Sequence, residues 1–149
     1  MDARFETFTV LISKISRNIR KIKNQEMAEY NLRSSHISCL YYLYLTEGLT
    51  ATDLCERCEE DKATISRSLD YLEQNGYLTC HSKTQKRYKS PLLLTEKGMA
   101  AGKKIAEKIK HVLEEVSVGL TEEERVAFYR SLTIISNSLD KVSKNSKER

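Results

Sequence analysis

The apolar positions of this 149-residue sequence predict a long amphipathic helix near each end of the chain. From Phe5 to Ile22 the apolar residues recur at alternating spacings of three and four, which is the pattern of a seam along one face of a helix. The same alternation runs from Phe128 to Val142. Each seam is an apolar stripe that needs a partner surface to cover it.

Two shorter helices are predicted in the first half of the chain. The apolar positions of the first are Ile37, Leu40, Tyr41, Tyr44 and Leu45, and Gly48 is its expected stop. Thr50 is the expected N-cap of the second, with Asp53 three residues later in the first turn, where the helix dipole favours an acid.

A further helix is expected between Asp61 as N-cap and Asn75-Gly76 as C-terminal stop. Its apolar face is narrow and consists of Ile65, Leu69 and Leu72. The opposite face combines small residues, which permit close approach to another surface, with two cations suited to phosphates or guanines: Lys62, Ala63, Ser66, Arg67 and Asp70.

An extended hairpin should follow, because "YLTCHS" and "YKSPLLLT" flank the basic turn "KTQKR". Pro91 confines its strand to an edge or a bulge, since proline cannot donate to the hydrogen-bond ladder. Thr95 is the expected N-cap of a long helix, whose apolar face is Ile105, Ile109, Val112, Leu113 and Val116.

Composition supports a helical fold, and the distribution of charge indicates a class of partner. Hydrophobic residues make up 40% and charged residues 31%, with five Gly and one Pro, which is typical of a folded, mostly helical chain. The net charge is only +4, but residues 82–106 hold seven Lys and Arg against the single acid Glu96. A segment of this kind attracts polyanions.

Several classes of protein are disfavoured. No segment reaches the roughly 20 apolar residues of a membrane span, and the N-terminus lacks the pattern of a secretion signal, so we expect a cytoplasmic protein with no membrane partner and with reduced thiols. The sequence has no Gly-rich phosphate loop, nucleophile elbow or His-Glu-x-x-His string, and its His residues at 36, 81 and 111 form no pattern. We expect no enzyme and no cofactor.

The Cys55-x-x-Cys58 pair has three readings: core packing, a redox switch or a metal site. A structural zinc site needs four ligands, and the remaining candidates, Cys80-His81 and the pair His36 and Cys39, are loosely placed. Because a buried Cys behaves as a small hydrophobe, packing is favoured, with Cys58 between two helices. Cys55 and Cys58 stay as the candidates for redox or metal chemistry.

Two short helices, the second basic on its free face, followed at once by a basic hairpin, are typical of a winged helix-turn-helix. With long helices at both ends, the chain resembles the MarR family of transcriptional regulators over nearly its whole length. The strings "TATDLCERCEEDKATISRSLDYLEQNGYL" and "LLLTEKG" carry the likeness. The expected fold is mainly α (α+β), with dimerisation helices at 1–30 and 97–144, a winged helix-turn-helix at 31–96 and a disordered tail at 145–149.

The resemblance implies a homodimeric repressor that binds double-stranded DNA at a near-palindromic operator. In the reading helix the implied DNA contacts are Lys62, Ala63, Thr64, Ser66 and Arg67. The family's wing signature places an Asp two residues before an Arg, but Lys86 and Tyr88 stand there in this chain. On charge alone, the expected wing contacts are Lys83, Lys86 and Arg87.

The resemblance also implies a small aromatic effector, for which the candidates are Tyr41, Tyr42 and Tyr44, although packing is an alternative for Tyr41 and Tyr44. Two other functions remain open. One is a redox- or metal-responsive winged-helix sensor, because "DLCERC" looks faintly like an ArsR-family metal motif. The other is a helical adaptor that does not bind DNA, suggested by the altered wing and the acidic run at 59–61.

Overall fold

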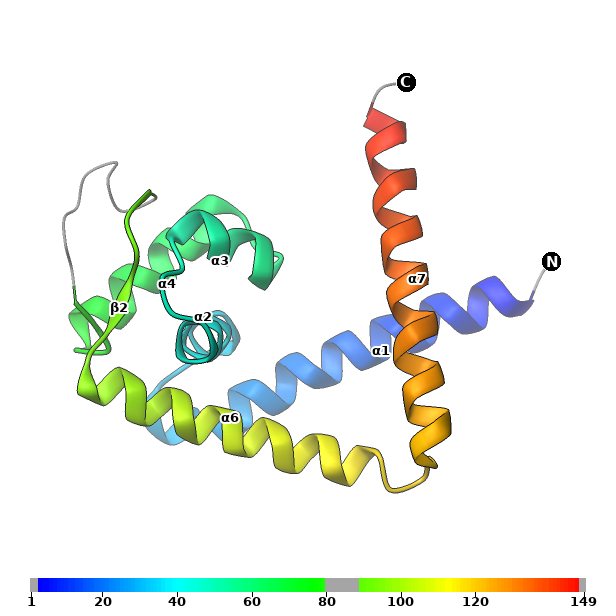
Figure 1. Cartoon of the computed structure of the whole chain (residues 1–149), viewed down its shortest axis with the longest axis horizontal. Helices are drawn as coiled ribbons and strands as arrows, with labels where there is room; N and C mark the ends of the chain where they lie inside the picture. The colour runs from blue at the N-terminus through cyan, green and yellow to red at the C-terminus, as the bar shows by residue number, and fades with distance from the viewer. Residues whose placement is uncertain (1–2, 80–88, 148–149) are drawn as a thin grey trace. The chain divides into compact units, whose positions relative to one another are not determined.

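The computed structural model describes residues 3–79 and 89–147, which form a mostly helical chain with one small sheet. This confirms the predicted fold class. The elements shown in Figure 1 are α1 (Ala3–Glu26), η1 (Ala28–Tyr30), α2 (Ser34–Leu45), α3 (Ala51–Cys58), α4 (Lys62–Gln74), β1 (Leu78–Thr79), β2 (Leu93–Leu94), α6 (Glu96–Val116) and α7 (Glu122–Lys147). The chain divides into two compact units, residues 1–108 and 109–149, and α6 runs across the boundary.

The core of the first unit lies where α2, α3 and α4 pack on one another. Figure 1 shows these helices gathered together (cyan to green). Their inward side chains are fully buried, and the buried set includes Ile37, Leu40, Leu54, Ile65, Leu69 and Leu72. The three residues predicted to hold α4 to the core, Ile65, Leu69 and Leu72, are therefore confirmed.

The burial pattern of α2 differs from the prediction. Leu45, assigned to its apolar face, is 54% exposed, whereas Cys39 and Leu43 are buried. The reason is that α2 contacts α1, α3, α4 and β2, so side chains on several sides of this helix are covered. A single-stripe pattern describes a surface helix and fails for one packed on more than one side.

The predicted caps of α3 and α4 are present. Thr50 and Asp53 form a capping box: the Thr50 side chain accepts from the backbone N–H of Asp53, and the Asp53 carboxylate accepts from the N–H of Thr50. Asp61 caps α4 by accepting from the N–H of Thr64 at 2.7 Å. At the other end of α4, Gly76 has φ +80°, a left-handed conformation that glycine adopts without strain.

The strands pair antiparallel, with Leu78 opposite Leu94 and Thr79 opposite Leu93. Pro91 precedes β2 and takes no part in the described ladder, and the N–H of Leu92 donates to the Leu49 carbonyl at 2.8 Å. The turn between the strands, residues 80–88, lies outside the described residues. The predicted hairpin is thus confirmed at its base.

Two glycines allow the first turns of α6 to pack closely against the rest of the first unit. Thr95 is the N-cap of α6, as predicted, and its side chain accepts a hydrogen bond from the N–H of Gly98 at 3.1 Å. A Cβ on Gly98 would lie 2.2 Å from the Tyr77 carbonyl oxygen, and one on Gly102 would lie 2.5 Å from the Tyr44 Cβ. Neither position has room for a side chain. The glycine of "LLLTEKG" is therefore a packing requirement.

The long terminal helices carry the exposed apolar residues that the seams predicted. On α1 these include Ile12, Ile15 and Ile19, and on α7 they include Phe128, Ile135, Leu139 and Val142. The C-terminal tail differs from expectation, because α7 continues to Lys147 and residues 145–147 are helical. Over the part of the chain that the structure describes, no helix is both long and apolar enough to cross a bilayer.

Candidate nucleic-acid interface

The candidate interface is the outward face of α4. The Asp61 cap fixes its first turn, and hydrogen bonds from Thr64 hold the pKa of the Asp61 carboxyl below its usual range, so the cap is ionised at neutral pH. On the inner side Ile65, Leu69 and Leu72 are buried. Polar positions between these residues are consequently turned away from the core.

The structure brings all five residues predicted for the reading helix onto the first two turns of α4. Lys62, Ala63 and Arg67 are exposed, while Thr64 and Ser66 are half-buried. Arg67 Nη2 donates to Thr64 Oγ1 at 3.3 Å, which orients the guanidinium along the helix. Small residues at 63 and 66 leave room beside Lys62 and Arg67 for a flat or grooved ligand.

A set of polar contacts that sequence reasoning missed anchors the inner side of α4. Ser68 is only 3% exposed, and its hydroxyl donates to Ser35 Oγ of α2 at 2.9 Å. Tyr71 donates to the Asn31 carbonyl at 2.6 Å, and its ring stacks on His36 with centroids 4.2 Å apart. A serine on the apolar stripe of α4, one residue from Leu69, was the available signal.

His36 has a structural role in this arrangement. Its Nδ1 accepts from the backbone N–H of Arg33 at 3.0 Å, which closes a capping box at the start of α2. Burial, with the nearby Arg33 charge, lowers the pKa of His36, so the ring is neutral at physiological pH. It is therefore a packing group against α4.

The turn that precedes α4 is acidic and places Glu59, Glu60 and Asp61 on the surface. Glu59 ends α3 in the left-handed region, with φ 54°. These carboxylates repel phosphates and oppose the attraction of Lys62 and Arg67. Their effect is to reduce non-specific affinity for a polyanion.

The basic segment predicted at 82–106 is less available than its charge suggested. Lys97 donates to the Asn75 carbonyl at 2.6 Å and lies over the Tyr77 ring, 4.4 Å from its centroid. Lys104 donates to the Tyr30 hydroxyl and pairs with Glu29 at 3.8 Å. Both lysines hold α6 to the first unit. The wing candidates Lys83, Lys86 and Arg87 lie outside the described residues.

The structure shows how far the cysteines are covered. Cys55 and Cys58 are both half-buried, so Cys58 is not a fully covered core residue. The third free cysteine, Cys39 of α2, is buried. Among the residues the structure describes, no three His, Cys, Asp or Glu side chains are grouped to hold a metal ion. Cys80 falls in the undescribed turn.

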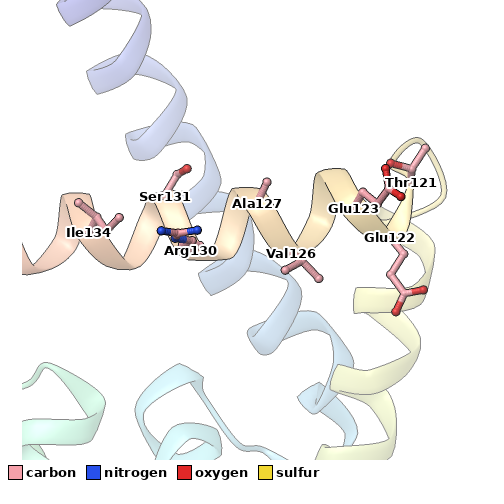
Figure 2. A pocket seen from close by; sticks show the side chains of 8 residues that line it. All are labelled: Thr121, Glu122, Glu123, Val126, Ala127, Arg130, Ser131 and Ile134. Atoms are coloured by element: carbon pink, nitrogen blue, oxygen red, sulfur yellow. The ribbon is translucent and has the colours of Figure 1, made fainter.

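The three candidate ligand tyrosines face different surroundings. All are half-buried, and the rings of Tyr41 and Tyr42 are tilted with centroids 5.4 Å apart. Tyr44 lies against Gly102 of α6, as the packing alternative for this residue expects. A separate open hollow runs along the first half of α7 (Figure 2), and its walls are Thr121, Glu122, Glu123, Val126, Ala127, Arg130, Ser131 and Ile134. These side chains of one segment do not form a catalytic or metal-binding set.

Comparison with known proteins places this architecture. Residues 30–87, which include α2, α3 and α4, match the sequence profile of the MarR family. Over this segment the chain is similar to the MarR family. The expectation that the chain is not an enzyme is in line with that similarity, because the family consists of transcriptional regulators.

Individual proteins show the same similarity. The chain is 27% identical to the HTH-type transcriptional regulator YybA of Bacillus subtilis over 134 residues, 90% of this chain and 85% of the relative. Among solved structures it resembles the Staphylococcus aureus MepR–DNA complex (TM-score 0.78, 22% identity, 89% of this chain and 97% of the other). It also resembles S. aureus MarR bound to salicylate and kanamycin (TM-score 0.79, 16% identity, 94% and 95%).

Proposed function

We propose that this chain is a MarR-family regulator, a cytoplasmic homodimeric repressor that inserts α4 of each subunit into the major groove of a near-palindromic operator. The observation that carries the proposal is the outward face of α4, which combines exposed Lys62 and Arg67 with small neighbouring residues on a helix anchored firmly behind. Similarity in fold to the MepR–DNA complex supports DNA binding, and a recognition helix in the major groove is the usual docking of this motif.

The residues of the face have different roles in this proposal. Arg67, at the exposed centre of α4, reads a guanine edge, because a guanidinium can donate two parallel hydrogen bonds to O6 and N7. Lys62, in the first turn beside the positive end of the helix dipole, contacts a phosphate. Ala63, Thr64 and Ser66 allow close approach and add contacts in the groove. Lys83, Lys86 and Arg87 extend the contact through the wing.

Dimerisation is proposed from the uncovered seams of α1 and α7. Ile15 and Ile19 of α1 and Leu139 of α7 are about half exposed, on helices of 24 and 26 residues. Apolar surface of this extent costs free energy in water, at roughly 25 cal/mol per Å². A second copy of the same helices covers both seams and also supplies the second α4 that a palindromic site requires.

The DNA-binding proposal is tested by selecting sites from random duplex DNA at about 0.15 M salt. An enriched near-palindrome with half-sites about one helical turn apart is expected. Arg67→Ala should lose about 1–3 kcal/mol of binding free energy and relax one base position, whereas Lys62→Ala should weaken binding to all sequences alike. Arg17→Ala, an exposed arginine of α1, is the matched control and should bind as the wild type. Absence of any enriched sequence favours the adaptor function instead.

The dimer is tested separately by sedimentation at micromolar concentration. Ile15→Asp should shift the chain from dimer to monomer, because it places a charge in the proposed interface. Lys14→Asp changes the neighbouring exposed position on the same helix and should leave the dimer intact. A wild-type chain that sediments as a monomer would contradict the proposal.

A small aromatic ligand is the proposed effector, supported by the similarity to the salicylate-bound MarR structure. The half-buried Tyr42 is the best-placed of the three tyrosines to contact such a ligand, since Tyr44 is occupied with Gly102. Salicylate titrated into a protein–operator complex should release DNA, and Tyr42→Ala should raise the concentration required. Release at the same concentration from both proteins would remove Tyr42 from the site.

A further inference from the structure

The outward face of α4 holds a hydrogen bond between two side chains that the fold does not require. Arg67 Nη2 donates to Thr64 Oγ1 at 3.3 Å. Arg67 is exposed and Thr64 is half-buried, so neither side chain fills the core. An arginine on a helix surface ordinarily samples many rotamers. The Thr64 hydroxyl restricts that freedom and gives the end of the Arg67 side chain a preferred direction.

The acceptor of this hydrogen bond is itself held in place. Thr64 lies in the first turn of α4, and its backbone N–H donates to the Asp61 carboxylate at 2.7 Å as part of the helix cap. Threonine is branched at Cβ, which restricts rotation about χ1 in a helix. Residues three apart are neighbours on one face of a helix. The Thr64 hydroxyl therefore has a defined position beside the Arg67 side chain.

The hydrogen bond leaves the guanidinium able to bind a base. A guanidinium carries five N–H donors, and Thr64 accepts from one of the two on Nη2 of Arg67. The other N–H of Nη2 and both of Nη1 remain. These two nitrogens can donate in parallel to O6 and N7 of a guanine. The neighbouring Ala63 and Ser66 are small and leave the approach to this fork open.

The length of the hydrogen bond limits the size of its effect. At 3.3 Å it is longer than the roughly 2.7–3.2 Å of most N–H···O bonds. A bond of this length at the surface guides the arginine without fixing it rigidly. Its benefit comes on binding, because a guanidinium that already points outward loses less conformational freedom when it meets the base. The expected gain in operator affinity is about threefold to tenfold.

We propose that Thr64 is the positioning residue for Arg67: its hydroxyl directs the guanidinium toward a guanine of the operator half-site and thereby determines specificity at that base pair. The inference rests on the DNA-binding function proposed above. It gives Thr64 a more specific role than the groove contact named there, because Thr64 acts on the DNA through Arg67.

Two substitutions separate the hydroxyl of Thr64 from its shape. Thr64→Val keeps the branched side chain but cannot accept a hydrogen bond, whereas Thr64→Ser keeps the hydroxyl. Each variant is titrated with the selected operator and with a duplex in which the G·C pair relaxed by Arg67→Ala is replaced by A·T. Thr64→Val should bind the operator about threefold to tenfold more weakly and the altered duplex as the wild type does. Thr64→Ser should retain most of the discrimination. A Thr64→Val protein that discriminates like the wild type overturns the proposal.

A double-mutant cycle decides whether Thr64 acts through Arg67. In the Arg67→Ala background, Thr64→Val should change operator affinity by less than about 1.5-fold, because the group that it positions is absent. A loss as large as in the wild-type background would indicate a direct contact of Thr64 with DNA and would overturn the positioning role. Thr133→Val is the matched control, an exposed threonine of α7 whose hydroxyl donates to the Tyr129 carbonyl, and it should leave both titrations unchanged.

A measurement without DNA separates this inference from the function on which it rests. In nitrogen NMR relaxation of the free protein, the Arg67 side-chain Nε–H should be more ordered in the wild type and in Thr64→Ser than in Thr64→Val. Equal mobility in the wild type and Thr64→Val would overturn the positioning role alone. A wild-type protein that enriches no operator contradicts the proposed function and this inference together, even where the difference in mobility is present.

Discussion

Replacing Gly98 with alanine is a sharp test of how α6 is seated. Gly98 is in the first turn of α6 and faces the backbone of Tyr77, where the chain leaves α4 for β1. The added Cβ would lie 2.2 Å from the Tyr77 carbonyl oxygen and 3.1 Å from both its carbonyl carbon and Leu94 Cδ2. Cβ atoms essentially never approach other atoms within 3.0 Å. Because the obstacle is backbone, it cannot rotate away.

Three contributions set the size of the effect. Forcing a methyl group into a packed site costs about 1–3 kcal/mol. The Tyr77 carbonyl also accepts from the N–H of Thr95 at 3.0 Å, and displacing it puts that hydrogen bond at risk, worth about 0.5–1.5 kcal/mol. Alanine returns up to about 1 kcal/mol through its better helix propensity. The net loss of unfolding free energy is therefore roughly 2 kcal/mol, within a range of about 0.5–4.5 kcal/mol.

The assay is urea unfolding followed by circular dichroism at one fixed protein concentration, because dimerisation would make stability depend on concentration. Gly119→Ala is the control, since a Cβ there meets no atom within 4 Å. For a chain of this size the loss at Gly98 corresponds to a fall in Tm of about 4–8 °C. A Gly98→Ala protein as stable as the wild type would refute the steric argument.

Other predictions test the caps, the anchor of α4 and its charge. The Asp53 carboxylate accepts hydrogen bonds from the N–H and the hydroxyl of Thr50, and these bonds lower the pKa of Asp53 in the folded state. The contribution of ionised Asp53 to folding stability is therefore complete above its unfolded pKa of about 3.9, and it is lost as the pH falls through the lower folded pKa. Asp53→Ala should therefore be less stable than the wild type at pH 7 in urea unfolding, with a gap that narrows in acid; a gap independent of pH would contradict this. Ser68→Ala should lower the free energy of unfolding by about 1 kcal/mol, because the variant lacks the hydrogen bond to Ser35. The control Ser138→Ala, at an exposed position of α7, should leave the free energy of unfolding unchanged. An equal loss of stability in the two variants would exclude the buried hydrogen bond as the cause. In operator titrations, Lys62→Ala should reduce the slope of log affinity against log salt by about 1, and an unchanged slope would argue against a phosphate contact.

The parts of the fold that the sequence predicted well are those determined by local chemistry. The Asp61 cap, the Thr50 capping box and the stop at Gly76 involve residues within a few positions of one another. The inner face of α4 was also predicted, because this helix packs on one side and has a single apolar stripe. The residues expected to contact DNA follow from these, since they occupy the remaining face.

What could not be predicted depends on contacts distant in sequence. Whether Lys104 is available to a polyanion depends on Tyr30, 74 residues away. How far Cys58 is covered depends on how α3 lies against α2, and its half-burial could not be predicted from the Cys-x-x-Cys spacing. The serine and tyrosine that anchor α4 are likewise explained only by Ser35 and Asn31 of the preceding segment.

The glycine and tyrosine pairs also limit how this chain can be recombined with its relatives. Tyr77 fits against Gly98, and Tyr44 fits against Gly102, so α6 and the segment before it are matched at two points four residues apart. A chimera joined between residues 44 and 102 would place a tyrosine of one protein against the α6 helix of another. The two surfaces would then either clash or leave a cavity. A junction after Lys108 keeps both pairs together and exchanges the second unit as an intact module.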